Sequence, residues 1–169
     1  MQQRFAQIIH ILTRVARFGA GLAFSVLIGA VLIQVIGRTF GRSPVWTEEL
    51  TRFALLYLAT FGAGLALKSG DLVNVDVVCE ALPGRGPWRL RLISAVLTAG
   101  VCILLASHAV RFVAIGKFQT SPAMTLQMNY VHFSVLLMLA LIAVFAVARI
   151  VGMLSGTDDG LPNKPQAED

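Results

Sequence analysis

Four long stretches of this sequence contain no Asp, Glu, Lys or Arg, and they set the strongest limit on its fold. They cover residues 18–37, 53–67, 92–110 and 118–148. An α-helix rises about 1.5 Å per residue, so about 20 apolar residues cross the roughly 30 Å hydrocarbon core of a bilayer. Only 14% of the residues are charged and 56% are hydrophobic, whereas a soluble domain carries about 25% charged residues. The pattern predicts an all-α membrane protein with four transmembrane helices.

The sequence around each stretch predicts where its helix begins and ends. Ser43-Pro44 is typical of a helix start, so the second helix is expected to begin near residue 44. The fourth stretch is too long for one upright span, and Ser121-Pro122 marks another start, so residues 121–128 are expected to lie partly along the interface. The predicted spans are 18–37, 46–68, 92–110 and 130–149, in a single domain of residues 1–155. Residues 156–169 are predicted to form a disordered cytoplasmic tail.

The Lys and Arg residues near the span ends predict the orientation. Nine of them flank the side that holds both termini and the second loop, and five flank the other side. Because cytoplasmic flanks carry the excess of Lys and Arg, both termini are predicted to be cytoplasmic. The first stretch follows Arg14 and Arg17 as in a signal peptide, but it is too long and lacks a small-residue cleavage site. It is therefore expected to remain as a span.

Two amphipathic segments and two small-residue faces accompany the spans. Residues 5–15 are expected to form an interfacial helix or a cytoplasmic extension of the first span, and residues 75–82 a short interfacial helix with Asp76 on its polar face. Small residues that let helices approach closely recur at helical spacing. They are Gly21, Ser25 and Gly29 in the first span, and Gly62 and Ala66 in the second. These faces are expected to pack within the chain's own bundle or against a second membrane protein.

Polar side chains concentrate just before the second stretch. Trp46 suits the aromatic belt of an interface, and Glu48 and Glu49 stand four and three residues before Arg52, so either can pair with it. Adjacent carboxylates on a helix point about 100° apart and do not form an acid–base dyad. This cluster is interpreted as a helix-end anchor or as a docking point for another subunit.

The chemistry that is missing narrows the function. No charged residue lies in the middle of a span, whereas transporters of charged solutes carry such groups at the bilayer midplane. The chain is therefore not expected to form a translocation path alone, and nothing in it indicates an enzyme. The net charge of +5 comes from residues at span ends, which indicates contact with lipid headgroups and not nucleic acid.

Two histidines leave a cofactor alternative open. His108 and His132 fall at similar depth on neighbouring antiparallel spans, and two such side chains can bind haem axially. The other interpretation is interfacial hydrogen bonding, with no cofactor and no metal. The cysteines, Cys79 and Cys102, form no CxxC motif and are interpreted as small packing residues.

The order of three motifs resembles a known family. The stretch from Phe40 to Arg52 looks like a W-[ST]-E-E-x-x-R signature, residues 68–76 resemble an R-x-G-x-H-I-x-V-D pattern, and residues 121–124 resemble S-P-A-L. These motifs are similar to those of the small, DctQ-type membrane subunit of TRAP (tripartite ATP-independent periplasmic) transporters. Lys68, Leu72, Gln127 and His132 depart from the family's usual residues.

The resemblance implies a function that the residues alone do not give. It implies a bacterial inner-membrane subunit that braces a large permease subunit, in a complex that also uses a periplasmic solute-binding protein. It further implies sodium-coupled uptake of an organic anion such as a dicarboxylate, keto acid or sugar acid, with sodium bound by the large subunit. The alternatives are a haem-bearing membrane anchor of a respiratory enzyme and a small dimeric exporter, although the chain lacks the embedded carboxylate that such exporters use.

Overall fold

The computed structural model describes residues 2–41, 44–69 and 86–155, and the side chains from residue 7 onward. The described chain forms four long helices, α1 (Gln2–Thr39), α2 (Trp46–Ser69), α4 (Gly86–Ile115) and α5 (Met128–Leu154), with a short 3₁₀ helix η2 (Gly116–Phe118) after α4. Each long helix is long and apolar enough to cross a membrane. The prediction of four transmembrane helices is confirmed at this level. Ser43, Asp76, the amphipathic segment at 75–82 and the tail at 156–169 lie outside the described residues.

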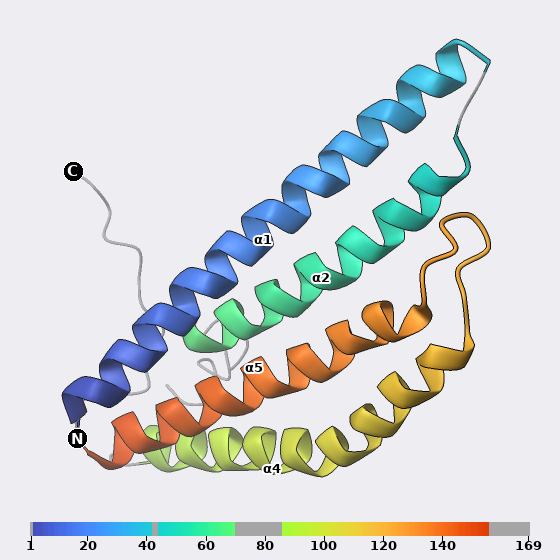
Figure 1. Cartoon of the computed structure of the whole chain (residues 1–169). Helices are drawn as coiled ribbons and strands as arrows, with labels where there is room; N and C mark the ends of the chain where they lie inside the picture. The colour runs from blue at the N-terminus through green and yellow to red at the C-terminus, as the bar shows by residue number, and fades with distance from the viewer. Residues whose placement is uncertain (1, 42–43, 70–85, 156–169) are drawn as a thin grey trace, which may run out of the picture.

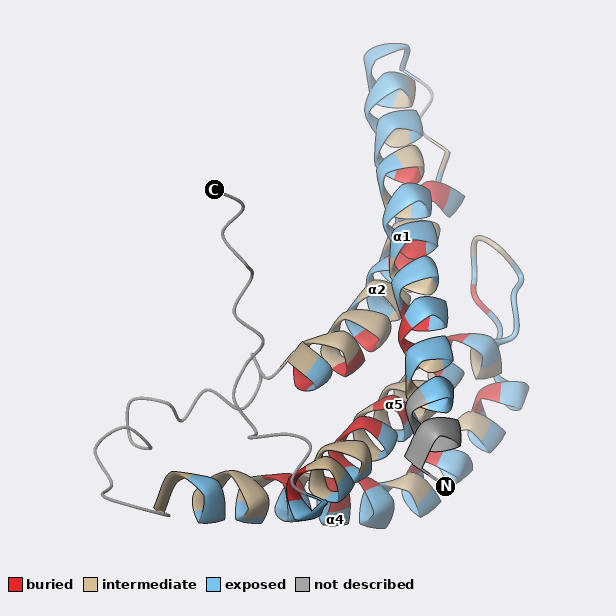
Figure 2. Ribbon diagram, turned by 90° about the vertical axis from the view of Figure 1, so that its left-hand side faces the viewer, coloured by how far each residue is buried: buried red, intermediate tan, exposed pale blue. Residues whose placement is uncertain are grey.

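The helices are arranged in the order α1–α2–α5–α4. Helix α2 contacts α1 on one side and α5 on the other, and α4 packs on the far side of α5 (Figure 1). In the side view α1 stands steeply while α4 runs across the base, so this row of helices is strongly twisted (Figure 2). The second and last spans therefore form the middle of the protein although they are far apart in sequence.

A repeat of mostly small residues explains how α1 packs on α2. Eight of the residues of α1 that are buried or half-buried recur at alternating intervals of three and four, the spacing of a coiled-coil seam. They are Thr13, Ala16, Ala20, Ala23, Leu27, Ala30, Gln34 and Gly37. Because most of these side chains are small, this face of α1 allows close packing on α2, as at Gly19 against the Phe61 ring.

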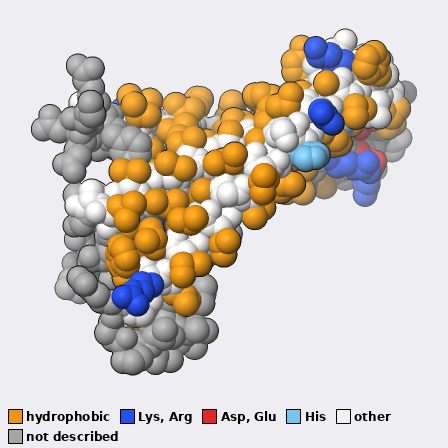
Figure 3. All heavy atoms as spheres, turned by 90° about the horizontal axis from the view of Figure 1, so that it is seen from below, with side chains coloured by type: hydrophobic (Ala, Val, Ile, Leu, Met, Phe, Trp, Pro, Cys, Tyr) orange, Lys and Arg blue, Asp and Glu red, His pale blue; other side chains and the backbone are white. Residues whose placement is uncertain are grey.

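A compact core joins the helices near the end of the bundle where α2 finishes. It consists of Leu67, Ala99, Leu141, Phe145 and Ala146, with half-buried Ile9, Leu12, Phe61, Leu137, Ile142 and Ile150 packed around them. Elsewhere most apolar side chains point outward, as Phe18 and Leu104 do (Figure 3). In the most apolar part of each span only 11–22% of residues are buried within the chain. The remaining surface suits lipid or another membrane protein.

The structure bears on three features near the span ends. Of the two alternatives for the segment at 5–15, the continuous helix α1 favours an extension of the first span. Helix α4 extends several residues beyond both ends of the predicted span at 92–110, which stays a prediction. Ser121-Pro122 does not start a helix: α5 begins at Met128, and residues 119–127 form a short hairpin closed by an antiparallel bridge between Thr120 and Gln127.

Candidate functional site at the Glu49 end of the bundle

The carboxylate of Glu49 holds the 119–127 hairpin against α2. It accepts a hydrogen bond from the Ser121 hydroxyl, and further bonds from the backbone N–H groups of Ala123 at 3.2 Å and Met124 at 3.1 Å. We call this arrangement the Glu49 clasp. Ser121 is almost completely buried. The clasp therefore joins two of the sequence motifs, which lie more than 70 residues apart, into one polar site.

The hairpin is tightly folded where the clasp holds it. The Ser121 N–H donates to the Leu126 carbonyl at 2.8 Å, and the Thr125 N–H donates to the Ser121 carbonyl at 3.0 Å. Thr125 has a φ of 51°, a left-handed conformation that a β-branched residue seldom adopts. Such a conformation persists only where surrounding contacts fix it. The Ser121 hydroxyl thus bonds to Glu49 and its backbone bonds within the hairpin. These bonds explain why Ser121-Pro122 does not start a helix.

Thr47 organises the start of α2. Its side chain is completely buried, and its hydroxyl donates to the Pro44 carbonyl at 2.6 Å. The backbone N–H groups of Thr47 and Glu48 also bond to the carbonyls of Pro44 and Val45. This turn fixes the direction in which Glu49 projects, so Thr47 is a positioning residue that sequence reasoning left out.

The predicted pairing of Arg52 with Glu48 or Glu49 is not seen as an ion pair among the described residues, where the Arg52 charge acts on Glu49 only from a longer distance. Glu48 instead forms an ion pair with Arg38 at 3.5 Å and accepts a hydrogen bond from Gln34 at 3.3 Å. Because the end of α1 lies beside the start of α2, these partners reach Glu48, while Glu49 is occupied by the hairpin. Arg52 is exposed and forms no ion pair within the part of the chain that is described.

Two hydroxyl groups connect α2 to α5 inside the apolar region. Tyr57 donates to the Tyr130 carbonyl at 2.5 Å, and the buried Thr60 donates to the Ser134 carbonyl at 3.0 Å. Hydroxyl side chains often hydrogen-bond between helices in lipid. A sequence feature could have indicated this contact, because Thr60 and Ser134 are hydroxyl residues within uncharged spans.

Thr60→Val should weaken the α2–α5 contact while nearly keeping the side-chain shape. The variant loses the bond to Ser134, and measured interhelical bonds in membranes average about 0.6 kcal/mol with a maximum near 1.7. We expect a loss of that order in unfolding free energy, measured by denaturation in detergent. Thr39→Val is the control, because Thr39 bonds only to Val35 of its own helix. Equal stability of Thr60→Val and wild type would contradict a bridging role.

The two histidines are used in different ways. His132 Nδ1 lies 3.1 Å from the Phe112 carbonyl of α4, and its ring stacks on Phe112 with centroids 3.9 Å apart. His108 is exposed, and its Nδ1 lies within hydrogen-bonding distance of Ser107 and Leu104 of its own helix. His132 thus serves as a contact between α4 and α5.

Gly116 allows the close turn between α4 and α5. A Cβ at this position would lie 2.6 Å from Nδ1 of His132 and 2.7 Å from backbone atoms of Asn129. No side chain fits there without a backbone shift. Gly116 was not recognised from the sequence, because a close approach between segments leaves no local pattern.

Comparison with known proteins identifies the family. The sequence profile described as the DctQ component of tripartite ATP-independent periplasmic transporters matches residues 27–156. The chain belongs to the DctQ family. A protein of Haemophilus influenzae described as a TRAP transporter small permease protein is 22% identical over 131 residues, which cover 77% of this chain and 79% of that protein. The ectoine TRAP transporter small permease protein TeaB of Halomonas elongata is 30% identical over 95 residues, covering 54% of this chain and 49% of TeaB.

Membership of the DctQ family fixes the general role. The chain is a small permease subunit of a TRAP transporter and a multi-pass protein of the bacterial inner membrane. In this member of the DctQ family, the Glu49 clasp connects the Trp46–Arg52 motif to the Ser121–Met124 motif through direct hydrogen bonds. The structure thus gives these two motifs a shared physical role.

The small-residue faces of this DctQ-family chain are not where its own helices approach most closely. Gly21, Gly29 and Gly62 have no neighbour within 4 Å of an added Cβ, and Ser25 is exposed. Close approach occurs at Gly19 against the Phe61 ring and at Gly64 against Leu141. Gly21, Gly29 and Gly62 thus make no close approach within the described chain, and the packing of these small-residue faces against a second membrane protein stays a prediction.

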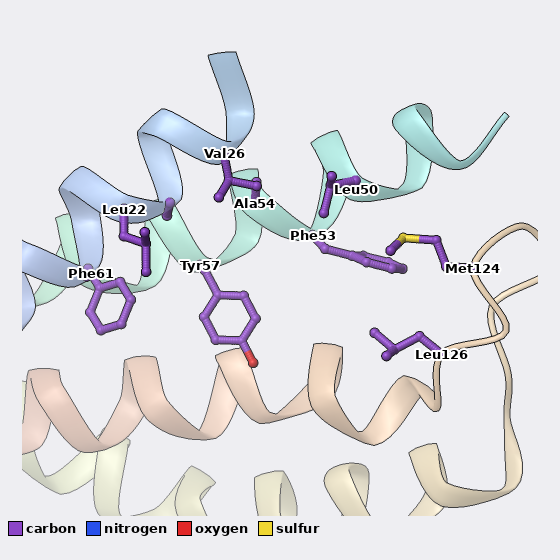
Figure 4. Close-up of a pocket in the computed structure, with 11 residues that line it drawn as sticks. Leu22, Val26, Leu50, Phe53, Ala54, Tyr57, Phe61, Met124 and Leu126 are labelled. Atoms are coloured by element: carbon purple, nitrogen blue, oxygen red, sulfur yellow. The ribbon is translucent and has the colours of Figure 1, made fainter. Parts of the chain in front are cut away.

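An apolar groove lies beside the Glu49 clasp. It has a volume of about 340 Å³ and is formed by α1, α2 and the hairpin (Figure 4). The Tyr57 hydroxyl, its one side-chain polar group, points to α5, where it is bonded. The lining residues are Gly19, Leu22, Ala23, Val26, Leu50, Phe53, Ala54, Tyr57, Phe61, Met124 and Leu126. A groove of this composition suits an apolar occupant and does not suit a charged solute.

Proposed function

We propose that this small permease subunit braces the large permease subunit of its TRAP transporter and carries no translocation path itself. The observation that supports the proposal most directly is the distribution of polarity. The polar groups of the Glu49 end are used to hold the chain's own segments together, whereas most apolar side chains of the spans point outward. This combination is that of a rigid body with a large surface for lipid and a membrane partner.

Co-purification tests the bracing role. The chain is co-expressed with the large permease subunit and purified in mild detergent through a tag on the small subunit. We expect a stable heteromeric complex, and uptake that needs both subunits and the solute-binding protein. A small subunit that always purifies alone, or full uptake without it, would refute the proposal.

We further propose sodium-coupled uptake of an organic solute by the whole complex. The expectation of an organic anion rests on the family resemblance, while one relative carries ectoine in its name. Uptake of a dicarboxylate, a keto acid, a sugar acid and ectoine, each with and without a sodium gradient, distinguishes these solutes. Transport that is independent of sodium would contradict the coupling.

Arg52→Glu should weaken assembly with the large subunit without unfolding the small one. Arg52 is exposed and has no ion pair within the described part of its own chain, so its charge is available to a carboxylate of the partner. Truncating or reversing one member of a desolvated charge pair costs roughly tenfold or more in affinity. We expect a corresponding fall in co-purified large subunit. Lys117→Glu is the control, since Lys117 is also exposed at this end of the bundle, and an equal effect of both variants would point to general charge repulsion.

A further inference from the structure

The apolar groove beside the Glu49 clasp is long and narrow. Phe61 of α2 lies at one end, and Met124 and Leu126 of the hairpin lie at the other (Figure 4). The lining on α2 runs from Leu50 to Phe61, which is about 16 Å along a helix that rises about 1.5 Å per residue. A volume of about 340 Å³ spread over that length leaves room only for a slender occupant.

The size of the groove distinguishes between two apolar occupants that are available in a membrane, a helix of another protein and a lipid tail. An α-helix with its side chains is about 10–12 Å across, so one turn fills roughly 400–600 Å³. The whole groove, at about 340 Å³, is smaller than that single turn. A partner helix can therefore cover the groove without entering it, whereas a hydrocarbon chain can lie along its length.

The groove lies at a depth where lipid tails are present. Its walls on α1 and α2 belong largely to the uncharged stretches at 18–37 and 53–67, in helices that are long and apolar enough to span a membrane. Leu22 and Val26, which line the groove on α1, are partly exposed, so the groove is open to its surroundings. Lipid tails are as apolar as Leu, and a hollow that stays empty loses dispersion contacts with its lining.

We propose that this groove binds one acyl chain of a membrane phospholipid. The headgroup lies at the Glu49 end of the bundle, because that end of the groove is nearest to the start of α2. Met124 lines the groove with its side chain and donates its N–H to Glu49 at 3.1 Å, so the acyl chain contacts a residue that the clasp fixes. With the predicted orientation, the lipid belongs to the periplasmic leaflet. The proposal rests on the membrane location of the chain and not on its bracing role.

Photolabelling of the full-length chain tests the proposal. The chain is purified in mild detergent with a phosphatidylethanolamine that carries a diazirine in one acyl chain, and the labelled residues are identified by mass spectrometry after illumination. We expect the label to concentrate on groove residues such as Val26, Phe53 and Met124, and an excess of ordinary phosphatidylethanolamine to remove it. Leu104, which is exposed on α4 outside the groove, reports non-specific contact with lipid. Equal labelling of Leu104 and of the groove residues would overturn the proposal.

Matched substitutions separate binding in the groove from general contact with lipid. Val26→Trp places a large ring in the groove, and this overpacking should lower the labelling of Phe53 roughly tenfold. Val101→Trp makes the same change at an exposed position of α4 and should leave the labelling of Phe53 unchanged. Val26→Ala widens the groove and should retain the labelling, which separates filling of the groove from misfolding. Unchanged labelling in Val26→Trp, or equal loss in all three variants, would contradict a lipid site in this groove.

The complex with the large permease subunit provides the test against a protein occupant. The same photolabelling is carried out on the small subunit after co-purification with its partner. We expect Val26 and Phe53 to remain labelled, because a partner helix can cover the groove without filling it. Loss of the label on assembly would overturn the proposal and assign the groove to side chains of the large subunit. A failure to form the complex would count against the bracing role alone, since labelling of the isolated chain tests the lipid site separately.

Discussion

Glu49→Gln is expected to release the 119–127 hairpin from α2. A carboxylate accepts hydrogen bonds at both oxygens, whereas an amide accepts at one, and its NH₂ group then faces the Ala123 N–H. The Ser121 hydroxyl and the two N–H groups must share a single neutral oxygen in place of a charged carboxylate. Since hydrogen bonds to charged groups are among the stronger ones, we expect hydrogen exchange at Ala123 and Met124 to accelerate about tenfold or more.

The neighbouring carboxylate provides the control for this variant. Glu48→Gln makes the same chemical change one residue earlier, but removes only an exposed ion pair with Arg38. Exposed pairs contribute about 0–1 kcal/mol, so exchange in the hairpin should match the wild type. If both variants accelerate exchange equally, the effect comes from helix α2 as a whole and not from the clasp.

Gly116→Ala is expected to disrupt the turn between α4 and α5. The added methyl group would overlap backbone atoms of Asn129 and the His132 ring, with distances of 2.6–2.7 Å. Backbone cannot move aside as a side-chain tip can, and overpacking of this kind typically costs about 1–3 kcal/mol. We expect a loss within that range in unfolding free energy in detergent, together with lower yield of folded protein.

Gly100→Ala is the matched control on helix α4, which directly precedes Gly116. Gly100 has nothing within 4 Å of an added Cβ, and Ala is favoured over Gly inside a helix by about 0.5–1 kcal/mol. This variant should be as stable as wild type or more stable. A Gly116→Ala protein with wild-type stability would show that the α4–α5 turn can rearrange freely.

The sequence was sufficient to predict the spans and the location of the polar end. Uncharged runs of 15 to 31 residues predict transmembrane helices because lipid admits few other structures. The Trp46–Arg52 motif was recognised as a polar site from composition alone. These features depend on local sequence, so they are visible without the fold.

The partners of individual side chains were not predictable in the same way. Helical spacing favoured Arg52 for both carboxylates, but Arg38 and the hairpin reach them first. Ser121-Pro122 has a local preference for a helix start that the contact with Glu49 overrides. Gly19 and Gly64 make the close approaches in place of Gly21 and Gly62, since which face of a helix meets a neighbour depends on the whole bundle.

The Glu49 clasp also has a consequence for biogenesis. Its two halves are separated by more than 70 residues and by two of the four spans. As a chain is made from its N-terminus, α2 enters the membrane before residues 121–124 exist, and the carboxylate has no hairpin to hold. Closing so long a loop is possible only once α4 has crossed and the hairpin has emerged. The engagement of Glu49 therefore marks the chain as inserted through α4, with α5 still to follow, and a product truncated before Ser121 would present this carboxylate without its partners.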